Sequence, residues 1–146
     1  MRNDECGMRN GRKGGMGERI PVRVMDEGIR ELQQRFKRFG LAIIQMTEKS
    51  PNSRAANVIA NQIIRSGTSP GANYRAACRS RSNAEFVAKL GIVEEELDET
   101  LYWLEVLVEA GFLPQKDADP LTKEANELLG IVVASIRTAK KRSLPR

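Results

Sequence analysis

The apolar residues of this chain recur at spacings of three and four over most of its length, a period that predicts amphipathic helices. No segment alternates with a period of two, so we expect no β-sheet. Four stretches carry the helical pattern, and proline, glycine or capping residues separate them. The pattern predicts an all-α protein with four helices within residues 26–142.

The first predicted helix runs from about residue 26 to between Thr47 and Ser50. The second begins with Ser50 as N-cap and Pro51 at the first helical position, where the missing N–H removes no hydrogen bond. The apolar face of the first helix is expected to hold Ile29, Leu32, Phe36, Phe39, Ile43 and Met46. The inward face of the second is expected to hold Ala56, Ile59, Ile63, Ser66, Asn73 and Ala77.

The third predicted helix has the clearest start, since Ser82 and Glu85 match a capping box. Gly111 is expected to end it in a Schellman motif. Asp119 and Pro120 then predict the start of a fourth helix, which fades near residues 140–142. The inward face of the third helix is expected to hold Phe86, Leu90, Val93, Leu97, Leu101, Leu104 and Val108. That of the fourth is expected to hold Leu121, Ala125, Leu128, Val132, Ser135 and Ala139.

Short connections between long helices favour antiparallel neighbours, so we expect an up-down-up-down four-helix bundle. Residues 1–25 hold five of the twelve glycines and show no apolar period, which predicts an unstructured leader. Residues 143–146 form a short tail. Met8, Met16 and Met25 leave open where translation starts.

The amino-acid composition excludes several classes of function. The 146 residues include no histidine, which excludes Ser-His and Cys-His nucleophiles and the usual near-neutral general base. Cys6 and Cys78 lie far apart and form no metal-binding or disulfide pattern. The chain has neither a secretory signal nor a run of about 20 apolar residues, so we expect a cytoplasmic protein that contacts no membrane.

The acidic residues of the third helix raise a metal site as an alternative, because Glu95 and Glu99 share a helical face. Di-iron bundles, however, need Glu-x-x-His motifs on two helices. We therefore expect no catalytic residue, metal or cofactor, and we expect the acids to form ion pairs instead.

The net charge of +5 is unevenly distributed. Residues 33–82 carry +8, residues 83–136 carry −9 and residues 137–146 carry +5. The first two helices and the tail are thus basic and the third helix is acidic, so part of the charge can be neutralised between helices or between subunits.

The segment from Arg65 to Tyr74 places Gly67, Pro70 and Gly71 inside the second helix, where they lower helix stability. One interpretation is a kink whose small residues admit a neighbouring helix, with Ser66, Ser69 and Asn73 bonding freed carbonyls. The alternative is a phosphate-binding loop, although the GxxxxGK[ST] spacing is absent.

The third helix also carries a second stripe, which includes Trp103 beside Tyr102. Its members are Ile92, Glu96, Glu99, Trp103, Val106 and Ala110. Such a wide apolar face favours a protein interface, so we expect a homo-oligomer.

Residues 62–112, QIIRSGTSPGANYRAACRSRSNAEFVAKLGIVEEELDETLYWLEVLVEAGF, resemble the four-helix-bundle family encoded in intervening sequences of bacterial large-subunit ribosomal RNA genes. Relatives include the accessory variability determinant of diversity-generating retroelements. The residues that carry the resemblance, and that we take as motif or interface positions, are Ser69, Asn73, Phe86, Leu90, Glu95, Glu99, Tyr102, Trp103 and Leu104.

The resemblance, over residues 28–141, implies a homopentameric bundle without enzymatic activity. In the retroelement relatives it implies binding to a reverse transcriptase and to nucleic acid through basic surface. Two positions depart from the family pattern: Pro70 stands where an aliphatic residue is common, and Ala76 where many members have Glu.

Two hypotheses follow. The first is an accessory protein that binds DNA or RNA, a reverse transcriptase, or both. Its candidate nucleic-acid contacts are Arg35, Lys37, Arg38, Arg54, Arg65, Arg75, Arg79, Arg81, Lys140, Lys141 and Arg142. The second is a scaffold that contacts only protein. It gains if Arg75, Arg79 and Arg81 pair with Glu95, Asp98 or Glu99 of the same or a neighbouring subunit.

Overall fold

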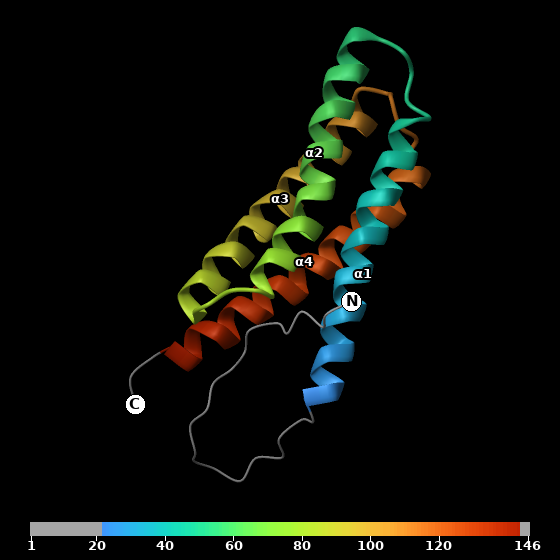
Figure 1. The fold of residues 1–146 in the computed structure, drawn as a ribbon. Coiled ribbons are helices and arrows are strands. Elements are labelled where there is room, and N and C mark those ends of the chain that lie inside the picture. Colours follow the sequence, from blue (N-terminus) through green and yellow to red (C-terminus); the bar gives the residue numbers. More distant parts are fainter. Residues whose placement is uncertain (1–21, 144–146) are drawn as a thin grey trace.

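The computed structural model describes residues 22–143, with side chains described from residue 26 onward. Over this range the chain forms four helices and no strand: α1 (Val22–Thr47), α2 (Arg54–Ala77), α3 (Asn83–Glu109) and α4 (Gln115–Ser143). Successive helices run in opposite directions (Figure 1), which confirms the predicted up-down-up-down bundle. No helix in the described part is long and apolar enough to span a membrane.

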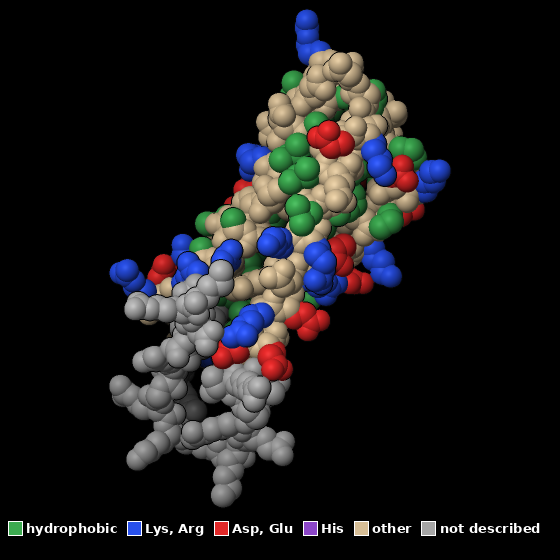
Figure 2. Space-filling model, turned by 45° about the vertical axis from the view of Figure 1, so that its right-hand side comes forward, with side chains coloured by type: hydrophobic (Ala, Val, Ile, Leu, Met, Phe, Trp, Pro, Cys, Tyr) green, Lys and Arg blue, Asp and Glu red, His purple; other side chains and the backbone are tan. Residues whose placement is uncertain are grey.

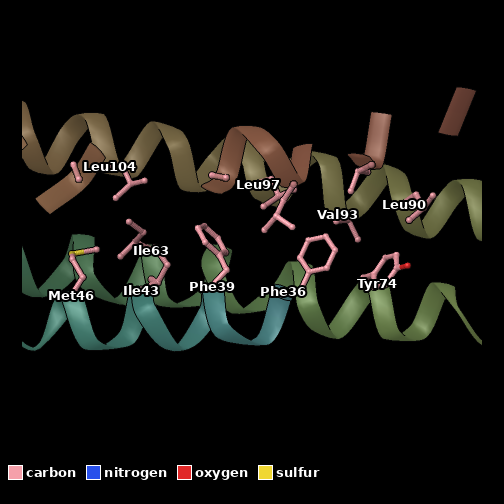
Figure 3. Packing of buried hydrophobic residues seen from close by; sticks show 14 of the residues in the cluster. Phe36, Phe39, Ile43, Met46, Ile63, Tyr74, Leu90, Val93, Leu97 and Leu104 are labelled. Carbon is pink, nitrogen blue, oxygen red and sulfur yellow. The ribbon is translucent and has the colours of Figure 1, made fainter. Parts of the chain in front are cut away.

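The core lies between the four helices and includes most of the residues predicted to face inward. Figure 3 shows side chains of α1, such as Phe36 and Ile43, pointing toward those of α3, such as Leu97 and Leu104. Several further core positions were not predicted, although each lies three or four residues from a predicted or another core position. They are Pro70, Tyr74, Thr100, Leu107 and Ile136.

The two boundaries of α3 agree with the sequence prediction. The Ser82 hydroxyl accepts a hydrogen bond from the Glu85 amide at 3.1 Å, while the Glu85 carboxylate accepts one from the Arg81 amide at 3.0 Å. At the other end Gly111 adopts a φ of +76°, and the amides of Phe112 and Gly111 donate to the carbonyls of Leu107 and Val108. These two bonds define a Schellman motif.

Three other boundaries were wrong. Helix α2 is capped by Ser53, whose hydroxyl accepts from the Ala56 amide, so Ser50 and Pro51 lie in the preceding connection. Helix α4 begins at Gln115, which leaves Pro120 inside the helix; the carbonyl that loses its donor belongs to the exposed Lys116 and can bond water. Helix α1 begins at Val22, within the predicted leader of residues 1–25; residues 1–21 lie outside the described part.

Small residues bring α1 and α2 close together. A Cβ added to Gly67 would lie 2.9 Å from Cγ1 of Ile43, and one added to Gly40 would lie 3.4 Å from the Gly67 carbonyl oxygen. A Cβ on Gly71 would touch Phe36 at 3.5 Å. These contacts confirm the prediction that the small residues of α2 admit a neighbouring helix. The phosphate-binding loop is wrong, because this segment is helical and packs on α1.

Replacing Gly67 with alanine tests this close approach. Ile43 is completely buried and cannot move aside freely, so we expect Gly67→Ala to lower the free energy of unfolding by about 1–3 kcal/mol. Gly91 of α3 is the matched control, since its Cβ would meet nothing within 4 Å. There the better helix propensity of alanine is expected to raise stability by up to about 1 kcal/mol. Denaturant unfolding measures both, and equal stabilisation by the two changes would contradict the packing.

Candidate nucleic-acid interface

Most basic residues of the second half of the sequence gather at one end of the bundle, where the turn between α2 and α3 meets the last turns of α4. Asn83 fixes this contact: its side-chain amide donates to the Ala139 carbonyl at 2.8 Å and bonds the Ser143 hydroxyl. Figure 2 shows Lys and Arg side chains on the lower half of the visible face, with Asp and Glu side chains among them. We call this region the basic end; it comprises Arg75, Arg79, Arg81, Arg137, Lys140, Lys141 and Arg142.

The local structure explains why these side chains face outward. Arg79 and Arg81 are exposed and flank Ser80, which is only 5% exposed. Arg75 lies in the last turn of α2, and Lys140, Lys141 and Arg142 lie in the last turn of α4. Cations are favourable at these positions because helix C-termini carry partial negative charge.

Few acids oppose this charge on the α2, α3 and α4 side. Residues 75–89 and 137–143 contain eight Lys and Arg and one acid, Glu85, whose carboxylate accepts from the Arg81 backbone. The side chains of Arg75 and Arg81 form no ion pair within the described part of the chain. Asp26, Glu27 and Glu31 occupy the first turns of α1 at the same end and limit the basic surface on that side.

Two predicted contacts, Arg35 and Arg65, are instead held by intrachain ion pairs. Arg65 of α2 donates to Glu96 of α3 at 3.0 Å and also bonds Glu99. Arg35 of α1 donates to both oxygens of Glu124 of α4, at 2.6 and 2.9 Å, and bonds Glu127. Hydrogen bonding to these carboxylates raises the pKa of both arginines, so both remain charged but are engaged within the bundle.

The remaining predicted contacts lie away from the basic end. Arg54 is the first residue of α2, about 30 Å along the helix from Arg75 at 1.5 Å per residue. Lys37 and Arg38 are exposed on the middle of α1. The sequence analysis missed Arg137, which is exposed one turn before Lys140 and Lys141. Arg137, Lys140 and Lys141 follow an i, i+3, i+4 spacing, which places them on one helical face and indicates that Arg137 belongs to the basic end.

The motif residues of α2 make local bonds. The Asn73 amide donates to the Ser69 carbonyl at 3.0 Å and to the Ser69 hydroxyl at 2.9 Å. Next to them, the hydroxyl of Ser66 lies 3.4 Å from the Ile63 carbonyl and shares a buried hydrogen bond with Thr100 of α3 at 3.0 Å. The predicted bonding of freed carbonyls is not confirmed: Ser66 and Asn73 bond the carbonyls of Ile63 and Ser69, whereas Pro70 frees the carbonyl of Ser66.

The motif residues of α3 divide into buried and exposed groups. Phe86 packs against the core, and Glu99 accepts hydrogen bonds from Arg65 and, at 3.1 Å, from the Trp103 indole. Tyr102 makes an edge contact with the Trp103 ring but is 56% exposed. Glu95 is exposed. Among the described residues, no group of three or more Cys, Asp and Glu side chains is arranged to hold a metal ion.

The sequence profile of the 23S rRNA-intervening sequence protein family matches residues 30–134. The chain belongs to this family.

A solved structure supports the family assignment. This chain is 29% identical to a protein of unknown function from the S23 ribosomal protein family of Bacteroides thetaiotaomicron, with a TM-score of 0.70. The match covers 75% of this chain and 97% of the other. None of the curated proteins matches significantly.

The contact between Arg65, Glu99 and Trp103 makes a pH-sensitive reporter. Arg65 holds the pKa of Glu99 below its ordinary value, and the Trp103 indole lowers it further. Because a depressed carboxyl pKa stabilises the fold above the unfolded-state pKa, this stabilisation is lost as pH falls through the folded-state pKa. Trp103 is the chain's single tryptophan, so its fluorescence reports on Glu99 directly.

We expect Arg65→Met to raise the midpoint of the acid transition in Trp103 fluorescence, because the carboxylate loses its main stabilising partner. The control is Arg75→Met, which removes an exposed arginine of the same helix that forms no ion pair in the described part of the chain. It is expected to leave the midpoint unchanged. Identical midpoints in the wild type and Arg65→Met would show that the ion pair does not govern Glu99.

Proposed function

We propose that this family member is a non-enzymatic, oligomeric bundle that binds nucleic acid through the basic end. The proposal rests on one observation. The Asn83 hydrogen bond holds the turn that carries Arg79 and Arg81, together with Arg75 before it, next to the C-terminal basic residues of α4. Two segments more than 50 residues apart in sequence thereby build one cationic surface. Exposed guanidinium and ammonium groups on such a surface suit phosphate oxygens.

The ligand we propose is the sugar-phosphate backbone, with little preference for base sequence. The basic end is formed by the ends of α2 and α4 and a short turn, so it does not present a helix lengthwise for reading bases in a groove. A nucleic-acid enzyme such as a reverse transcriptase is a further candidate partner, which the family resemblance supports. We place this activity in the cytoplasm, as the sequence predicts.

A scaffold that contacts only protein is the second candidate. The ion pairs of Arg35 and Arg65 favour it, since they show that part of the basic charge serves contacts between helices. The acids proposed to neutralise the basic cluster, however, pair elsewhere or stay exposed: Glu99 binds Arg65, whereas Glu95 and Asp98 face outward. The arrangement of charge therefore supports the nucleic-acid proposal more strongly.

A salt-dependent titration distinguishes the two functions. We expect the wild type to bind duplex DNA or RNA at low salt, with an affinity that falls steeply as salt increases. Arg79→Ala/Arg81→Ala is expected to reduce the slope of log affinity against log salt by about 1.8 for duplex DNA, because two phosphate contacts are lost. Fluorescence anisotropy at several salt concentrations measures this slope.

Lys116→Ala/Lys123→Ala is the matched control, since it removes two exposed lysines of α4 outside the basic end. It is expected to leave the slope near the wild-type value. Absence of wild-type binding at low salt would refute the nucleic-acid proposal and favour the scaffold. An equal loss of slope in both double variants would show that binding follows net charge and not the basic end.

A further inference from the structure

One serine hydroxyl of the basic end is both exposed and free to give up its proton. Ser82 is exposed, and its oxygen accepts a hydrogen bond from the Glu85 amide, but its O–H donates none within the described part of the chain. The other hydroxyls of this region differ. Ser80 is only 5% exposed, while Thr138 and Ser143 donate to the carbonyls of the residues four positions before them.

The residues around Ser82 are those of a substrate for an arginine-directed serine kinase. Arg79 and Arg81 are exposed and stand three positions and one position before it. Kinases of this class recognise such arginines because carboxylates beside their active site bind guanidinium groups. The backbone of Ser82 is extended, with a φ of −143° and a ψ of 161°, which is the conformation in which a kinase holds its acceptor serine.

We infer that Ser82 is a phosphorylation site and that a phosphate there weakens the binding of nucleic acid to the basic end. This inference rests on the proposed function and adds a means of regulating it. In the reaction the Ser82 Oγ attacks the γ-phosphorus of ATP, and the new O–P bond forms as the bond to the bridging oxygen of ADP breaks. The hydroxyl proton passes to the catalytic aspartate of the kinase, and ADP leaves.

The effect on binding follows from the charge around Ser82. Residues 75–89 and 137–143 contain eight Lys and Arg and one acid, Glu85. A phosphoserine adds a charge of about −1.5 to −2, and its oxygens bond guanidinium groups strongly. The phosphate would therefore engage Arg79 and Arg81 and repel the sugar-phosphate backbone. We expect the affinity for nucleic acid at low salt to fall at least about tenfold.

The first measurement determines whether Ser82 accepts phosphate. The full-length wild type and Ser82→Ala are incubated with a purified arginine-directed serine kinase and Mg-ATP, and peptide mass mapping locates the phosphate. We expect phosphate on Ser82 of the wild type and none at the basic end of Ser82→Ala. If the kinase modifies a peptide of residues 77–86 but not the folded protein, the site is overturned, because the turn then withholds the hydroxyl.

The second measurement determines whether the phosphate weakens binding. Fluorescence anisotropy at low salt compares the unmodified wild type, the phosphorylated wild type and Ser82→Asp on duplex DNA. Aspartate is a good N-cap residue, so Ser82→Asp is expected to fold and to bind at least about tenfold more weakly than the wild type. Ser53→Asp is the matched control, since Ser53 caps α2 as Ser82 caps α3 and lies at the opposite end of α2.

Ser53→Asp is expected to bind as the wild type does. Equal affinity of the phosphorylated and unmodified protein would overturn the regulatory effect, as would an equal loss in both aspartate variants. A wild type that binds no nucleic acid would refute the proposed function and, with it, this effect. The phosphate mapping would still support or overturn Ser82 as the acceptor, so the two failures are distinguishable.

Discussion

The packing of α2 against α3 determines which charged residues form ion pairs and which stay exposed. At one level of the bundle the completely buried hydroxyls of Ser66 and Thr100 bond each other, so the two helices have a single favourable register there. That register places Arg65 opposite Glu96 and Glu99, and Glu99 in turn beside Trp103. A shift of one helical turn would separate these ion-pair partners and break the hydrogen bond between the two buried hydroxyls.

This register divides the arginines of α2 into two classes. Arg65 lies where α3 offers carboxylates, while Arg75 lies beyond the acidic part of α3 and near the C-terminal basic residues of α4. The acids of α3 left without a partner are those on its outer face. A chain with a modest net charge of +5 thus presents one strongly basic end and one acidic face. The proposed nucleic-acid contact uses the basic end.

The parts of this architecture that depend on neighbouring residues could be predicted from the sequence. Ser82 and Gly111 act through bonds within one turn of chain, so both ends of α3 were predicted correctly. The start of α2 was not, because Ser50 and Ser53 are both suitable N-caps and only the folded chain selects Ser53. The glycines of α2 suggested a close approach but not that Ile43 fills the space at Gly67. Arg35 and Arg65 form ion pairs with acids of other helices, so the residues near them in sequence do not predict these pairs.

The most direct test of the central claim, that the basic end contacts nucleic acid, is photocrosslinking of the wild type to a short RNA containing 4-thiouridine, followed by peptide mapping. We predict crosslinks within residues 75–89 and 137–143, which come together at the Asn83 contact. Crosslinks confined to the region around Arg54 or to the middle of α1, with none in those two segments, would contradict the account.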